Sequence, residues 1–154
     1  MRARSWHVLG AGAAVLAALL VFTRLDFGRP AESKAIDPND PAQVALGEKL
    51  YAAQCASCHG EDLQGQLDWQ SRRADGTYPA PPHDETGHTW HHADALLFDY
   101  TKRGGAVVIG GNFKSSMPGF GDHLTDDEIR AVIAFIKSTW PSQIRQRQEE
   151  RNGG

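Results

Sequence analysis

The amino-acid sequence predicts an all-α domain in which three main helices are joined by long loops. Three segments, residues 40–54, 89–103 and 125–140, combine helical spacing of apolar residues with start or stop signals. Between the first two, residues 60–82 have no sustained period and are rich in turn-forming residues. A loop of that length in a compact domain is usually functional or wraps around something. At 154 residues the chain is long enough for one domain with attachments.

The first predicted helix begins at Asp40. Its carboxylate can cap the helix, Pro41 suits the first helical position, and Gln43 is placed to reach back to the cap. An apolar face is expected along Ala45, Leu46, Lys49, Leu50 and Ala53, with Gly47 and Tyr51 on a neighbouring face. A glycine inside a helix costs about 1 kcal/mol relative to alanine, so we expect another helix to cross closely at Gly47.

Residues 89–103 predict the second helix, which Gly104 should end. Its apolar face is expected to consist of Ala93, Leu96, Leu97 and Tyr100. The apolar run 106–109 lies between two glycine pairs and predicts either a brief strand or a buried loop.

The third predicted helix has the clearest boundaries. Thr125 is its cap, Glu128 completes a capping box, and Pro141 follows its end. Its apolar stripe is expected to be Ile129, Val132, Ile133 and Ile136. Residues 142–154 form an almost wholly polar tail, which we expect to be a frayed helical extension with no site of its own.

The first helix leads directly into Cys55-Ala56-Ser57-Cys58-His59, and these are the only cysteines in the chain. Two thiols separated by two residues and followed by histidine indicate covalent attachment of c-type haem, in which His59 binds the iron. The competing hypothesis is a redox dithiol of the thiol–disulfide oxidoreductase class. Such a dithiol is expected after a β-strand, at the start of a helix in a βαβ pattern, whereas here a helix precedes the motif.

A second iron ligand is predicted at Met117, the only methionine besides the initiator, and Pro118 follows it. A thioether opposite an imidazole favours reduced iron and raises the potential. With both axial positions occupied, the iron would pass electrons without binding a substrate, so the sequence predicts an electron carrier and not an enzyme. An alternative is that His88, His91 or His92 replaces Met117.

The motifs Gly47-x-x-x-Tyr51, Cys55-x-x-Cys58-His59, Met117-Pro118 and a C-terminal helix with Phe135 occur in this order. The arrangement resembles the class I mono-haem c-type cytochromes, of a membrane-anchored bacterial type, over roughly residues 40–141. The resemblance implies a cytochrome c-like fold around one covalent haem c. It also implies that the first and last helices cross at Gly47, with Tyr51 against Phe135.

The same resemblance implies that a proline carbonyl accepts a hydrogen bond from the second ring nitrogen of the proximal histidine. Pro81 and Pro82 both match this part of the haem pocket, and spacing does not choose between them. The segment between His59 and Met117 departs from the family by its length and its many histidines.

Residues 6–22 are uncharged and follow Arg2 and Arg4. No small-residue cleavage site follows them, so we predict an uncleaved signal-anchor transmembrane helix over residues 1–23, with a cleaved signal peptide as the alternative. A polar linker (24–39), the haem domain (40–141) and the polar tail (142–154) would complete the chain. Because haem attachment is expected outside the cytoplasm, we expect a single-pass protein of the inner membrane with its haem domain on the periplasmic side.

Charge is distributed unevenly along the chain. Residues 1–30 carry four arginines against one acid, and the remainder has twelve bases and eighteen acids, a net charge of −6. An acidic domain disfavours nucleic acid as a partner because phosphates would repel it. The expected partners are redox proteins of the membrane or periplasm, with no small-molecule substrate.

His83, His88, His91 and His92 fall within ten residues, together with Asp84 and Glu85. His88 and His92 would share a helical face and form a workable pair for copper or zinc. The alternative function is therefore a haem-containing protein that handles copper or senses redox state through residues 83–92. The simpler interpretation is that these histidines lie on the surface, hydrogen-bond the haem or cap a helix.

Overall fold

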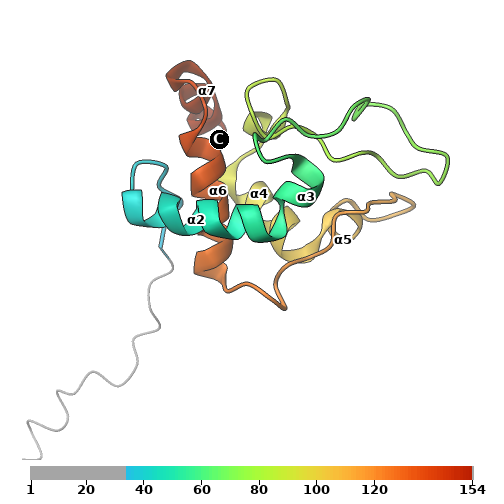
Figure 1. Ribbon diagram of the computed structural model, residues 1–154, viewed down its shortest axis with the longest axis horizontal. Helices are drawn as coiled ribbons and strands as arrows, with labels where there is room; N and C mark the ends of the chain where they lie inside the picture. Colours follow the sequence, from blue (N-terminus) through green and yellow to red (C-terminus); the bar gives the residue numbers. More distant parts are fainter. Residues whose placement is uncertain (1–33, 154) are drawn as a thin grey trace, which may run out of the picture. The chain divides into compact units, whose positions relative to one another are not determined.

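The computed structural model of the protein describes residues 34–153. Over this range it is helical, with no strand, which confirms the mostly helical fold predicted from the sequence (Figure 1). The helices are α2 (Pro41–Gln54), α3 (Ala56–His59), η1 (Thr89–His91), α4 (Asp94–Arg103), α5 (Gly105–Ile109), α6 (Asp126–Ser138) and α7 (Ser142–Asn152). Within the described range no helix is long and apolar enough to cross a membrane. The predicted transmembrane helix at 1–23 lies outside the described residues.

Helices α2 and α6 cross in close contact and form the centre of the fold (Figure 1). Gly47 is buried at the crossing, and a Cβ atom there would overlap the carbonyl of Ala131 and lie 2.8 Å from the Cβ of Phe135. One turn further on, the rings of Tyr51 and Phe135 pack with their centroids 5.4 Å apart. The crossing inferred from the glycine is therefore present.

The buried face of α2 differs from the predicted one. The buried residues are Gln43, Gly47 and Tyr51, whereas Leu46 is 42% exposed and the other residues of the expected face are exposed or partly buried. Because α6 approaches α2 closely, the face of α2 that carries Gly47 is buried, and the more apolar face stays exposed or partly buried. Gln43 does not bind the cap residue either, because its side chain accepts from the backbone of Asp37.

Helix α6 begins as predicted. The side chain of Thr125 accepts from the backbone of Glu128, and the Glu128 carboxylate accepts from the backbone of Thr125. The four residues of the predicted stripe, Ile129, Val132, Ile133 and Ile136, are buried. They divide between two apolar clusters, one with α2 and the end of α6, the other with α4.

The second predicted helix is interrupted. Thr89–His91 forms a single 3₁₀ turn, His92 and Ala93 are extended, and α4 starts only at Asp94. The run after Gly104 is the short helix α5, not the strand or loop expected. Gly104, at φ +82°, separates the two helices.

The polar tail is helical and packed, not frayed. Gln148 of α7 is fully buried and donates to the carbonyl of His92 at 3.1 Å and to the carboxylate of Asp94 at 2.7 Å. The same carboxylate binds the buried ammonium of Lys137 through both oxygens, at 2.8 Å each. These bonds join α7 to α4 and α6 around one acidic group.

Candidate functional site: the α2–α3 junction

The cysteine motif occupies the junction between α2 and α3. Cys55 ends α2 and caps α3, and His59 is the last residue of α3. Cys55 is partly buried, Cys58 is exposed, and both are free thiols. The short helix therefore presents two separate thiols and one imidazole within a single turn and a half of backbone.

His59 is buried, at 7% exposure, and is held by a backbone oxygen. Its Nδ1 atom lies 2.9 Å from the carbonyl oxygen of Pro81. The carbonyl of Pro82 instead faces the Thr89 hydroxyl, at 3.4 Å. Of the two prolines considered from the sequence, the structure brings Pro81 to this nitrogen.

Pro81 reaches His59 because the chain folds back along residues 60–66. The backbone N–H of Gly65 donates to the carbonyl of His59 at 2.7 Å, and that of Gln66 donates to the carbonyl of Ala80 at 2.9 Å. Gly65 has φ +66°, and a Cβ atom there would lie 2.6 Å from the carbonyl carbon of Pro81. Glycine at position 65 is thus needed both for the turn and for the close approach.

The surroundings of His59 keep it neutral. Burial lowers the pKa of His59, and its hydrogen bond to the Pro81 carbonyl opposes that effect. A carbonyl can only accept, so Nδ1 carries the proton and donates to Pro81, and the lone pair is left on Nε2. A neutral imidazole fixed through Nδ1 is the form that binds a metal ion through Nε2.

Cys55 does not resemble the attacking thiol of a redox dithiol. Burial, with a smaller effect of Cys58, raises the pKa of Cys55 to about 11. Thiol–disulfide oxidoreductases instead lower the pKa of the attacking cysteine so that it is a thiolate near neutral pH. The described chain also lacks the strand that would precede such a motif.

Met117 lies in the loop between α5 and α6 and is partly buried. Its backbone N–H donates to the Ser115 hydroxyl at 3.1 Å, and its carbonyl accepts from Gly105 at 3.4 Å. The backbone of the Met117 loop also packs on Gly104. The loop is therefore anchored at the junction of α4 and α5.

The histidine-rich segment does not form one metal-binding cluster, although the rings of His88 and His92 lie with their centroids 5.3 Å apart. The ring of His83 stacks on that of His59, with centroids 4.0 Å apart, and desolvation of His83 lowers its pKa well below the usual range. His88 stacks on Trp69, with centroids 5.2 Å apart, and His91 stacks on a neighbouring tryptophan. In residues 34–153 no group of three His, Cys, Asp or Glu side chains is arranged to hold a metal ion.

His83 was predicted only as a member of the candidate metal-binding segment 83–92, and its stacking on His59 was not predicted. His83 lies two positions after Pro81. Because the Pro81 carbonyl binds His59, a residue so close to Pro81 is expected to lie near the His59 ring. The spacing from Pro81 was therefore a usable signal in the sequence, but the neighbouring histidines favoured a metal-binding interpretation of His83 instead.

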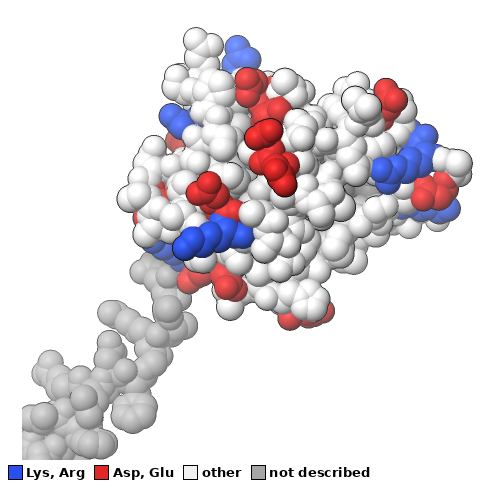
Figure 2. Space-filling view, in the orientation of Figure 1, with Lys and Arg blue, Asp and Glu red and all other residues white. Residues whose placement is uncertain are grey.

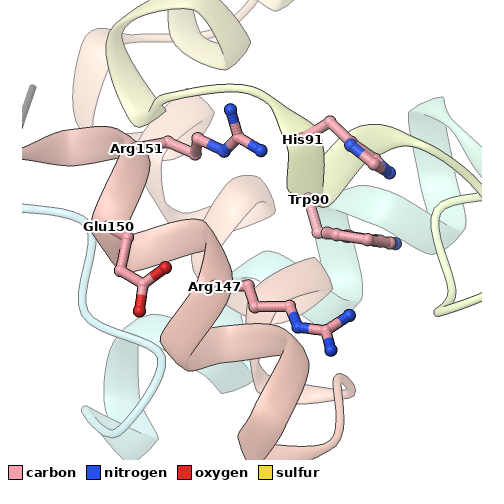
Figure 3. Close-up of a pocket in the computed structure, with 5 residues that line it drawn as sticks. All are labelled: Trp90, His91, Arg147, Glu150 and Arg151. Carbon is pink, nitrogen blue, oxygen red and sulfur yellow. The ribbon is translucent and has the colours of Figure 1, made fainter.

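A cavity of about 550 Å³ lies between η1 and α7, away from the motif residues. Figure 3 shows the side chains of Arg147 and Arg151 extending from α7 toward Trp90 and His91. Glu150 also contributes to its wall. None of the haem-motif residues lines this cavity.

The residues at the junction fit a covalent haem. Two free thiols lie in the spacing that haem attachment needs, and the following imidazole is neutral and fixed through Nδ1, with Nε2 left to bind iron. This donor set suits one haem c bound by Cys55 and Cys58 with His59 as the proximal ligand.

Comparison with known proteins gives the same result. The cytochrome c family model matches residues 44–140. The chain is 26% identical over 101 residues to the cbb3-type cytochrome c oxidase subunit CcoP of Rhodobacter capsulatus, covering 66% of this chain and 31% of that one. It is 33% identical over 103 residues to thiosulfate dehydrogenase of Stutzerimonas stutzeri (66% and 29%). It is 27% identical over 95 residues to cytochrome c6 of Diacronema lutheri (62% and 94%).

The chain thus spans about a third of the length of the CcoP and thiosulfate dehydrogenase relatives. Among solved structures, cytochrome CL from the marine methylotrophic bacterium Methylophaga aminisulfidivorans MPT superposes with a TM-score of 0.52 at 22% identity. That alignment covers 84% of this chain and 83% of the other, and it supports the fold. The family match spans most of α2, the cysteine motif, Met117 and all of α6, and the protein belongs to the cytochrome c family.

Proposed function

We propose that the protein is a membrane-tethered single-electron carrier, a mono-haem cytochrome c whose axial ligands are His59 and Met117. The observation that carries the proposal is the hydrogen bond from His59 Nδ1 to Pro81, 2.9 Å long. It leaves Nε2 for iron next to two thiols in the attachment spacing. When bound, haem supplies a one-electron Fe(III)/Fe(II) couple.

The residues of the chain have separate tasks in this proposal. Cys55 and Cys58 bind the cofactor covalently, and His59 binds its iron from one side. Pro81 orients His59, because a hydrogen-bonded outer partner fixes the ring of a metal ligand. Met117 supplies a soft neutral ligand on the other side. The anchoring of its loop on Gly105 supports a fixed position for that ligand.

A carrier role, and not an enzyme, follows from this ligand set. An iron bound by the protein on both faces has no free position for a substrate. Thiosulfate dehydrogenase is an enzyme by name, but the chain spans only 29% of that relative. Because the iron has no free position, no small-molecule substrate is expected.

The proposed tether is residues 1–23, placing the haem domain on the periplasmic side of the inner membrane. Tethering confines a carrier to the plane of the membrane and raises its effective concentration near membrane partners. Redox proteins of the membrane or periplasm are the proposed partners. On the face in Figure 2, Lys and Arg side chains are interspersed with Asp and Glu and form no continuous basic area, which agrees with a partner other than nucleic acid.

Haem attachment and ligation can be tested on the full chain. Haem staining of a denaturing gel should be positive for the protein and lost in Cys55→Ser with Cys58→Ser. The oxidised protein should show the sulfur-to-iron charge-transfer band, which Met117→Ala should abolish and Ser116→Ala should retain. Carbon monoxide should bind the reduced Met117→Ala variant and not the unaltered protein. Rapid carbon monoxide binding to the unaltered protein would contradict the carrier function.

The tether is tested by fractionation. The protein should remain in the membrane after an alkaline carbonate wash and be released only by detergent. A protein recovered in the soluble periplasmic fraction would instead support a cleaved signal peptide.

A further inference from the structure

The imidazole rings of His59 and His83 are stacked. Their centroids are 4.0 Å apart and their planes differ by 21°. Since His59 Nδ1 is also bound to Pro81, the proximal imidazole is contacted both at one edge and on one face.

His83 is itself fixed at three atoms. Its Nδ1 lies 2.8 Å from the Thr89 hydroxyl. Its backbone N–H donates to the carbonyl of Leu63 at 2.7 Å, and its carbonyl accepts from the indole nitrogen of Trp140, also at 2.7 Å. The Tyr51 ring lies beside the His83 ring at a steep angle of 73°, with centroids 6.4 Å apart. The two main-chain bonds fix the position of His83, and the bond to Thr89 together with the packing of Tyr51 restricts its ring beside His59.

A single hydrogen bond does not fix the plane of an imidazole. The second side-chain torsion of histidine is broad, so the ring of His59 can swing while keeping Nδ1 near Pro81. Contact with a flat, immobile ring on one face restricts that swing. The two contacts together determine the plane, whereas Pro81 alone determines only the direction of Nδ1.

We propose that His83 is a positioning residue for the proximal ligand, and that its ring sets the orientation of the His59 plane over the iron. The inference rests on the proposed binding of haem by His59. The orientation of an axial imidazole determines how its π orbitals overlap the iron d orbitals. That overlap sets the pattern of haem-methyl chemical shifts in the oxidised protein and contributes to the midpoint potential.

The test uses the full-length, haem-loaded protein and two variants of His83. His83→Ala removes the stacked ring and is expected to shift both the haem-methyl pattern in the NMR spectrum and the midpoint potential. His83→Phe keeps a flat ring without the nitrogen atoms and should restore the haem-methyl pattern toward that of the unaltered protein. A residue with only a structural role would lower the unfolding temperature and leave the haem-methyl pattern unchanged.

Two further variants complete the design. His123→Ala removes an exposed histidine outside residues 83–92, and it should leave the haem-methyl pattern unchanged. Thr89→Val keeps the side-chain volume but removes the partner of His83 Nδ1, and a smaller shift of the same kind is expected. If neither His83 variant binds haem, the haem-methyl pattern of Thr89→Val tests the role of His83 instead.

An unchanged haem-methyl pattern in His83→Ala, or in Thr89→Val as the deciding variant, would overturn the inference. Failure of the carrier function gives a different result. Carbon monoxide binding to the unaltered protein would show that Met117 is not a firm iron ligand. It would not affect the binding of iron by His59, so the His83 test would still apply. Absence of covalent haem on the gel would overturn both proposals together.

Discussion

Gly47 and Ala131 lie backbone to backbone where α2 crosses α6. A Cβ atom at Gly47 would overlap the carbonyl of Ala131 and lie 2.8 Å from the Cβ of Phe135. Both obstacles belong to the main chain or to the first side-chain atom, so neither can rotate away. This contact fixes the position of α2 against α6, and α2 leads directly into the two cysteines of the site.

Gly47→Ala is therefore expected to destabilise the protein. Overpacking a close contact costs about 1–3 kcal/mol or more, which exceeds the gain of about 1 kcal/mol from replacing glycine inside a helix. Denaturant unfolding measures the difference. Gly153→Ala is the control, since nothing lies within 4 Å of that position. A Gly47→Ala protein as stable as this control would show that the helices can separate at no cost.

The helix crossing could be predicted from the sequence because glycine destabilises the middle of a helix unless another backbone approaches closely there. The capping box of Thr125 and Glu128 was predictable for a similar reason, since it depends on residues only three positions apart. The buried face of α2 was not predictable from apolar spacing. There, backbone proximity at Gly47 decided which face turned inward, and Leu46 was left 42% exposed.

The partners of His59 were also only partly predictable from the sequence. A proline carbonyl was expected, but whether it belongs to Pro81 or Pro82 depends on how residues 60–66 fold back on the chain. The stacking of His83 depends on that same path. The docking of α7 depends on Gln148, a single buried amide in a polar segment with no apolar stripe. No local pattern marks such a residue.

Asp94→Ala is expected to cost about 3–5 kcal/mol, because it leaves a buried cation without its partner. The side chain of Lys137 is 2% exposed, and its ammonium binds both oxygens of Asp94. The matched control is Asp99→Ala, which breaks an exposed pair with Arg103 and should cost no more than about 0.5 kcal/mol. Urea unfolding of both variants tests the difference, and equal losses would contradict the structural role of Asp94.

His92→Gln is expected to raise the pKa of His88 toward its usual value. Burial lowers the pKa of His88 first, and the charges of His92 and His91 lower it further. NMR titration of the His88 ring measures the shift, with His123→Gln as the control. An unchanged titration of His88 in His92→Gln would contradict the coupling.

The same pKa shift makes stability depend on pH. A histidine with a lowered pKa in the folded state binds its proton more weakly there than in the unfolded chain. Its contribution to stability is therefore complete above the unfolded pKa, about 6.5, and is lost as the pH falls toward the folded value. In His92→Gln this loss on acidification should be smaller, which thermal unfolding between pH 7 and pH 5 will measure.

Tyr51→Phe is expected to loosen the end of α3. The Tyr51 hydroxyl donates to the carbonyl of Gly60 at 2.9 Å, and Gly60 directly follows His59. Losing this partly buried hydrogen bond should cost about 0.5–1.5 kcal/mol. Tyr78→Phe is the control, because its hydroxyl bonds to Arg72 in an exposed position.

A second measurement tests the burial of the Tyr51 hydroxyl. Burial raises the pKa of Tyr51 above its usual value. Its contribution to stability is therefore complete below the unfolded pKa, about 10, and is lost as the pH rises further. Unfolding experiments from pH 8 upward should show this alkaline loss in the unaltered protein and in Tyr78→Phe, and a weaker one in Tyr51→Phe. If Tyr51→Phe and the unaltered protein lose stability in parallel, the Tyr51 hydroxyl does not cause the alkaline loss, which would contradict its burial in the folded protein.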